Sequence, residues 1–186
     1  MNILWDFDGT LFDTYPAFTE AMYLLLDGKV DKHTILKELK ISFSNATKVF
    51  QLTENEILKF KEIELSLSPS LKPPFPYVED VLKRSGCNVI MTHKPKQEVH
   101  TILDYYDFHQ YFQGIVAGDD GFPRKPHAAS YQFLHDRHYL DLAVGDRELD
   151  ILPAKEIGLR TCLFQNDTAG ADFYVKSYRD FYDIIK

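Results

Sequence analysis

Two aspartates stand two positions apart near the start of the chain, in the stretch LWDFDGTLFDT. Asp6 and Asp8 follow an apolar run that is typical of a buried strand, so both carboxylates leave that strand at the same end. Two ionised carboxylates about 4 Å apart repel each other by roughly 4 kcal/mol at an effective dielectric of about 20. Because a cation or a proton must relieve that repulsion, the pair indicates a metal site or acid–base chemistry.

Other chemically capable side chains follow later predicted strands. The stretches NVIMTHK, GIVAGDDGFPRKP and LAVGDRELD supply Thr92, His93, Lys125, Asp146 and, one helical turn further on, Asp150. In an open parallel sheet, residues beyond the carboxyl ends of the strands meet at one edge. We therefore expect four carboxylates, a hydroxyl and a lysine to gather there around a hard divalent cation.

The elements that must position these residues alternate between strand and helix in the second half of the chain. The apolar pattern predicts strands over 2–6, 88–92, 114–118, 139–146 and 160–164, and helices over 78–86, 96–106, 127–138 and 148–158. Short, continuously apolar strands between helices indicate a parallel sheet that is covered on both faces. We predict an α/β fold of the Rossmann-like type, with helices on both faces of the sheet.

A helical segment interrupts this pattern after the first strand. The spacing predicts helices over 15–28, 31–40 and 53–66, with Asp31 as an N-cap and a capping box from Thr53 to Glu56. The proline-rich stretch SPSLKPPFPYVED ends the segment as a stiff connector. We predict a catalytic core made of residues 1–13 and 77–186, and an inserted α-helical cap domain over 14–76 that closes as a lid on hinges near Thr14 and Pro73.

The bulk composition narrows the class of protein. The chain has 186 residues, of which 45% are hydrophobic, and a net charge of −7. That charge argues against broad binding to nucleic acid. The longest apolar run, AMYLLL, is too short to span a bilayer, and the first residues lack the basic start of a signal peptide. With two cysteines and no CxxC spacing, these features predict a cytoplasmic protein without a membrane or nucleic-acid partner.

Four stretches together resemble a known family. DFDGTLFDT, MTHK, RKP with Lys125, and VGDRELD match the four motifs of the haloacid dehalogenase-like hydrolase superfamily in order and rough spacing. The sequence resembles the phosphatase branch with a helical cap, which includes enzymes like phosphoglycolate phosphatase. His93 departs from the pattern, because many relatives carry asparagine or a small residue there.

The resemblance implies a role for each matching residue. Asp6 would be the nucleophile that forms an aspartyl-phosphate, and Asp8 would be the general acid and then the base. The ligands of Mg²⁺ would come from Asp6, Asp8, Asp146 and, in the outer shell, Asp150. Thr92 and Lys125 would hold the phosphoryl oxygens. We expect further substrate contacts from Gly9, Thr10 and His93, and from Lys29 in the helical segment.

The sequence thus predicts a Mg²⁺-dependent phosphatase that hydrolyses a small phosphorylated metabolite, such as phosphoglycolate or a sugar phosphate. A sugar phosphomutase of the same fold is the main alternative, since it would use the same aspartyl-phosphate. A signalling receiver domain that accepts a phosphoryl group, or a catalytically silent binding protein, would also keep an acidic cluster. The substrate and the oligomeric state are left open by the sequence.

Overall fold

The computed structural model describes residues 1–186, which form two compact units. The core unit consists of Met1–Phe12 and Pro74–Lys186, and the helical unit is Asp13–Pro73. The divisions therefore follow Phe12 and Pro73, slightly before the predicted boundaries after residues 13 and 76.

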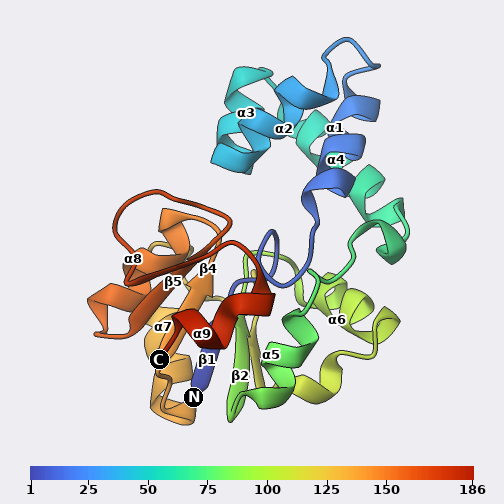
Figure 1. Cartoon of the computed structure of the whole chain (residues 1–186). Helices are drawn as coiled ribbons and strands as arrows, with labels where there is room; N and C mark the ends of the chain where they lie inside the picture. Colours follow the sequence, from blue (N-terminus) through green and yellow to red (C-terminus); the bar gives the residue numbers. More distant parts are fainter. The chain divides into compact units, whose positions relative to one another are not determined.

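The core unit is built on one six-stranded parallel sheet with the order β3-β2-β1-β4-β5-β6 (Figure 1). The strands are β1 Asn2–Trp5, β2 Cys87–Met91, β3 Gly114–Val116, β4 Leu142–Gly145, β5 Arg160–Phe164 and β6 Phe173–Val175. The helices are α5 Val78–Arg84, α6 Lys96–Tyr105, α7 Ala129–His138, α8 Glu148–Glu156 and α9 Phe181–Ile184, with 3₁₀ turns η2 His109–Tyr111 and η3 Tyr178–Asp180. The predicted parallel α/β sheet is confirmed.

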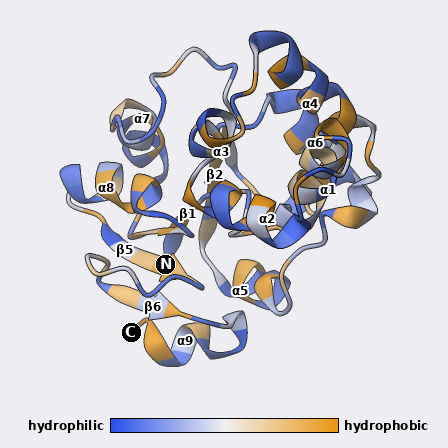
Figure 2. Cartoon of the chain, turned by 90° about the horizontal axis from the view of Figure 1, so that it is seen from above, coloured by the Kyte–Doolittle hydropathy of each residue, from blue (hydrophilic) through white to orange (hydrophobic).

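Helices cover both faces of this sheet because side chains alternate along each strand. On β1, Ile3 and Trp5 join one buried cluster, which includes residues of α5, α6 and α9. Leu4 joins a second cluster, on the opposite face, with residues of α7 and α8. Figure 2 shows that the helices carry both hydrophobic and hydrophilic residues.

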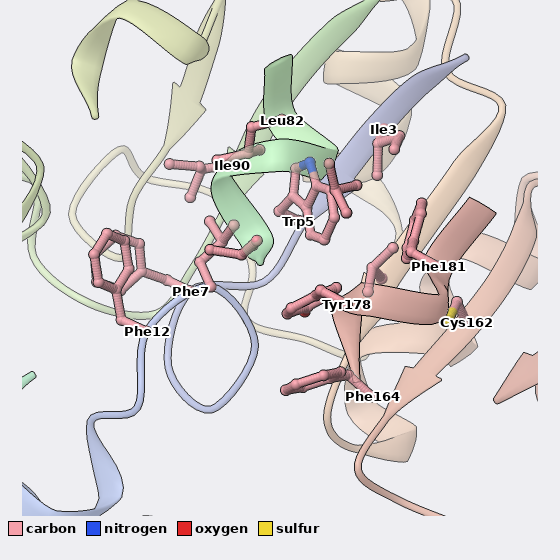
Figure 3. Close-up of a cluster of buried hydrophobic side chains, with 14 of the residues drawn as sticks. Ile3, Trp5, Phe7, Phe12, Leu82, Ile90, Cys162, Phe164, Tyr178 and Phe181 are labelled. Atoms are coloured by element: carbon pink, nitrogen blue, oxygen red, sulfur yellow. The ribbon is translucent and has the colours of Figure 1, made fainter. Parts of the chain in front are cut away.

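Aromatic packing holds the segment that follows β1 (Figure 3). The rings of Phe7 and Phe12 stack with centroids 4.7 Å apart, so they close the loop between them. Tyr178 stacks on Phe164 at 4.1 Å, and its hydroxyl donates a hydrogen bond of 2.8 Å to the backbone oxygen of Thr10. The loop of the first motif is therefore closed by its own two rings and joined to the core through the backbone oxygen of Thr10.

The helical unit contains α1 Tyr15–Leu25, α2 Lys32–Ile41, α3 Phe43–Val49, α4 Glu54–Ser66 and the 3₁₀ turn η1 Pro69–Leu71. Asp31 caps α2 and Thr53 forms a capping box with Glu56, as predicted. A separate buried cluster fills the unit, with Met22, Ile35 and Phe60 among its members. The unit therefore has a hydrophobic core of its own.

The two chain crossings between the units are held within each unit by backbone hydrogen bonds. In the helical unit, Asp13 N–H donates to the oxygen of Pro73 at 2.8 Å. In the core unit, Phe75 N–H donates to the oxygen of Leu11 at 3.0 Å. The entering and leaving segments thus run side by side.

Three short elements were not predicted: α3, β6 and α9. The strand β6 has three residues and pairs only with β5, so its apolar pattern is too short to be read from sequence alone. None of the helices combines the length and the apolar character that a membrane crossing requires.

Candidate active site

The position of β1 brings the predicted site residues to one edge of the sheet. β1 lies between β2 and β4, with Trp5 paired to Ile90 on one side and to Val144 on the other. Thr92 follows β2, Asp146 follows β4, and Asp6 continues β1 with a hydrogen bond of 2.9 Å to the oxygen of Val144. Three neighbouring strands therefore deliver their polar residues to the same place.

Asp6 is a buried carboxylate with two different partners. Lys125 Nζ donates to its Oδ1 at 2.6 Å, and the Thr10 hydroxyl donates to its Oδ2 at 3.5 Å. Burial, followed by the negative charge of Asp150, raises the pKa of Asp6 to about 6, although Lys125 acts in the opposite direction. Burial and the charge of Asp150 together thus outweigh the effect of Lys125 on the pKa of Asp6.

Lys125 joins Asp6 to Asp150. Its Nζ donates to Asp150 Oδ1 at 2.8 Å, and this ion pair is about as buried as the one with Asp6. Burial alone would lower the pKa of Lys125, but Asp150 and Asp6 outweigh it and hold that pKa above its ordinary value. Burial would likewise raise the pKa of Asp150, yet Lys125 and Arg147 bring it below its usual range. Lys125 is therefore a fixed positive charge between two carboxylates.

Asp150 is itself held in place by two hydrogen bonds. Arg147 N–H donates to Asp150 Oδ2 at 3.0 Å at the start of α8, and the buried Tyr131 hydroxyl donates to the Asp150 backbone oxygen at 2.9 Å. A Cβ atom placed on Gly145 would lie only 2.2 Å from the Cβ of Asp150. Because no side chain fits there, glycine at the end of β4 lets Asp150 approach the sheet edge.

The acidic residues fit a divalent cation. One carboxylate oxygen from each of Asp6, Asp146 and Asp150 lies within 4.8 Å of the others. Lys125 contacts Asp6 and Asp150, and Arg147 Nε lies 3.4 Å from Asp146 Oδ1. An excess of acid in a buried site favours a bound cation, and a set of hard oxygen donors favours Mg²⁺ or Ca²⁺ over softer metals.

Asp8, Gly9 and Thr10 form the loop beyond Asp6. Gly9 has a φ of +78°, in the left-handed region that glycine adopts without strain, and its N–H donates to the oxygen of Phe12 at 2.8 Å. Asp8 Oδ1 is buried, makes no hydrogen bond and lies 3.4 Å from Lys94 Nζ. The loop therefore turns sharply and keeps both carboxylates at the sheet edge.

Thr92 and His93 position the loops next to them. Thr92 is buried, and its Oγ1 accepts a hydrogen bond of 3.1 Å from Lys94 N–H. His93 Nε2 accepts one of 2.8 Å from the backbone N–H of Lys125. Burial, and then the charge of Lys125, lowers the pKa of His93 to about 3, so the ring is neutral near pH 7. The contact of His93 with the Lys125 loop was not predicted.

The remaining predicted residue, Lys29, belongs to the helical unit, where its exposed ammonium lies 3.2 Å from Asp27 Oδ2. The sequence placed Lys94 at the end of the NVIMTHK stretch beside the predicted sheet edge but gave it no role, and it did not single out Tyr131 or Arg147. All three contact predicted site residues. A signal for Lys94 was available, because Glu98 follows it at the i+4 spacing of a helical ion pair. Tyr131 and Arg147 had no such signal.

The amino-acid sequence is similar to a known protein family and to named members of it. Residues 3–164 match the family described as haloacid dehalogenase-like hydrolase. Phosphoglycolate phosphatase 1 of Pseudomonas aeruginosa is 28% identical over 181 residues, which cover 85% of this chain and 66% of that protein. The phosphoglycolate phosphatase of Aliivibrio fischeri is 27% identical over 181 residues, which cover 84% of this chain and 80% of that protein.

A solved structure agrees in fold and sequence. The hydrolase from Streptococcus pneumoniae TIGR4 is 30% identical, with a TM-score of 0.68, and the match covers 89% of this chain and 93% of that one. The family match extends over most of the chain and includes β1 to β5. The chain belongs to the haloacid dehalogenase-like hydrolase family, and the two curated relatives above are both named phosphoglycolate phosphatase.

Proposed function

We propose that the chain is a Mg²⁺-dependent phosphatase that hydrolyses a small phosphomonoester through an aspartyl-phosphate on Asp6. One observation carries the proposal: the buried Asp6 carboxylate lies among Lys125, Asp146 and Asp150 at the end of the central strand. A carboxylate attacks a phosphate dianion only when the repulsion between them is offset. Lys125 supplies one fixed positive charge for that purpose.

The two chemical steps divide between Asp6 and Asp8. In the first step, an Asp6 oxygen forms a bond to phosphorus, the bond to the leaving oxygen breaks, and Asp8 gives that oxygen its proton. In the second step, Asp8 takes a proton from water as the water oxygen attacks phosphorus, which releases phosphate and restores Asp6. Asp8 is suited to both steps because it lies two residues beyond Asp6 on the same loop.

The other predicted residues bind and orient. Lys125 and Thr92 hold the phosphoryl oxygens, and the turn at Gly9 and Thr10 directs the backbone towards the substrate. His93 keeps the Lys125 loop in place through its hydrogen bond of 2.8 Å. Asp6, Asp8, Asp146 and, in the outer shell, Asp150 would hold Mg²⁺, which when bound neutralises negative charge on the phosphoryl group and the carboxylates.

The names of the relatives suggest the substrate class, and the free thiols suggest the cellular location. Curated relatives are named phosphoglycolate phosphatase, so phosphoglycolate and sugar phosphates are the first substrates to test. The helical unit would serve as the cap, with Lys29 reading a polar or anionic group of the substrate. Both cysteines are free thiols, which is compatible with the proposed cytoplasmic location.

The test is phosphate release from a panel of metabolites by the wild-type chain and by Asp6→Asn, with Mg²⁺ and with EDTA. We expect turnover only in the wild type and only with Mg²⁺. Asp8→Asn should accumulate a phosphorylated protein, detectable by intact mass, with a substrate whose leaving group needs no proton. Normal turnover by Asp6→Asn would refute the nucleophile, and return of the phosphoryl group to a sugar product would identify a mutase instead.

A further inference from the structure

Lys94 is a buried lysine at the sheet edge that the chemistry above does not use. Its side chain is only 3% exposed. Its backbone is fixed on both sides, because its N–H donates to Thr92 Oγ1 at 3.1 Å and its oxygen accepts from Gly118 N–H at 2.9 Å. The residue therefore has a defined place between the end of β2 and the start of α6.

Acidic side chains lie beside the ammonium of Lys94. It forms an ion pair with Glu98, in the first turn of α6, and lies 3.4 Å from Asp8 Oδ1. A buried ammonium is costly unless acids surround it. Glu98 offsets the charge of Lys94, and the ammonium of Lys94 provides a hydrogen-bond donor beside Asp8.

The two aspartates of the first motif thus have separate lysines. Asp6 pairs with Lys125, which comes from the loop after β3, and Asp8 pairs with Lys94, which comes from the loop after β2. Asp8 Oδ1 is buried and makes no hydrogen bond, so the nearby ammonium is the charged group that can fix its direction. Proton transfer requires such a direction, since the acid must lie within hydrogen-bond reach of the leaving oxygen.

We propose that Lys94 is a positioning residue that directs the Asp8 carboxylate towards the leaving-group oxygen. The inference rests on the proposed phosphatase reaction and deepens it. Lys94 acts only through Asp8 and does not touch the transferred phosphoryl group. Loss of Lys94 should therefore lower the reaction rate most for substrates whose leaving oxygen needs a proton.

The test compares kcat/KM for two phosphomonoesters, because this ratio reports the step in which the leaving group departs. 2-Phosphoglycolate has an alkoxide leaving group that needs the proton, whereas 2,4-dinitrophenyl phosphate has an acidic phenol that does not. Lys94→Met should lower kcat/KM for the first by roughly 100-fold, the lower end of the range for general acid catalysis, and for the second by less than about threefold. Lys94→Arg should restore part of the difference.

The matched control is Lys96→Met, which removes the same charge two residues further on. Lys96 is exposed and pairs with Asp120 at the surface, so both kcat/KM values should stay within about twofold of wild type. Lys94→Met leaves Glu98 buried without this partner and could fold poorly. The double variant Lys94→Met/Glu98→Met removes both charges together and should show the same selective loss.

An equal loss for both substrates in the double variant would overturn the inference, because it would indicate a structural or phosphate-binding role. A rise in KM with unchanged kcat would also overturn it, since Lys94 would then bind the substrate. Failure of the proposed function is distinguishable, because Asp6→Asn would then hydrolyse both substrates as well as the wild type does.

Discussion

The buried contact between Lys125 and Asp150 gives the sharpest prediction. Lys125→Met keeps a similar side-chain volume but removes the ammonium from between Asp6 and Asp150. At 2.8 Å, the Coulomb attraction to Asp150 is about 6 kcal/mol at an effective dielectric of about 20, and desolvation of both groups offsets much of it. Breaking a buried pair from one side generally costs about 3–5 kcal/mol, so we expect the free energy of unfolding to fall by that amount.

A double-mutant cycle separates this ion pair from general loss of packing. Asp150→Asn removes a carboxylate charge that is unpaired once Lys125 is replaced. The loss of unfolding free energy in the double variant Lys125→Met/Asp150→Asn should therefore be smaller than the sum of the two single losses by at least about 1.5 kcal/mol. The assay is urea unfolding at pH 8 in EDTA, which keeps bound cations from compensating for the lost lysine. When the assay is repeated at pH 5, the loss of unfolding free energy caused by Lys125→Met should be smaller. At that pH the folded variant takes up protons on the carboxylates that have lost Lys125, and this removes their unpaired charge.

The control for the cycle is an exposed ion pair. Lys176 lies 3.3 Å from Asp167, and both side chains are largely exposed, so Lys176→Met should leave the free energy of unfolding nearly unchanged. Additivity of Lys125→Met and Asp150→Asn within about 0.5 kcal/mol would refute the reasoning, because it would mean that the two groups do not interact in the folded protein.

Four further variants have measurable outcomes. Gly145→Ala should lower kcat by at least about 100-fold, because the new Cβ displaces Asp150 by contact at 2.2 Å. Gly158→Ala, at the other end of α8, should cost only about 1 kcal/mol of stability and leave kcat unchanged, because its surroundings are open and only its φ of +79° is unfavourable. Tyr178→Phe should lower the free energy of unfolding by about 1–3 kcal/mol in urea titrations, because the Thr10 oxygen loses a buried donor; an unchanged value would contradict that contact. The pKa of His93 is about 3 in the folded protein and near 6.5 in the unfolded chain, so the unfolded chain binds more protons between these two pH values. The free energy of unfolding should therefore fall as the pH falls below 6.5. His93→Gln should show a shallower slope of unfolding free energy against pH.

The sequence by itself determined the parallel α/β sheet and the order in which its strands deliver polar residues. Short apolar runs that alternate with amphipathic helices leave few other folds, and residues at the carboxyl ends of such strands meet at one edge by topology alone. Asp6, Asp146 and Asp150 were therefore foreseeable as a cluster. The caps at Asp31 and Thr53 were foreseeable as well, because capping depends on residues three positions apart.

Only the tertiary structure decided which partner each of these groups has. The assignment of Lys125 to Asp6 and Asp150, and of Lys94 to Asp8, depends on how the loops after β3 and β2 fold back over β1. The same holds for Gly145, whose missing side chain makes room for an aspartate on the next helix. These residues are far apart in the sequence, so no local pattern predicts their contacts. The contacts form because the folded chain packs the loops together and because a buried charge needs a partner.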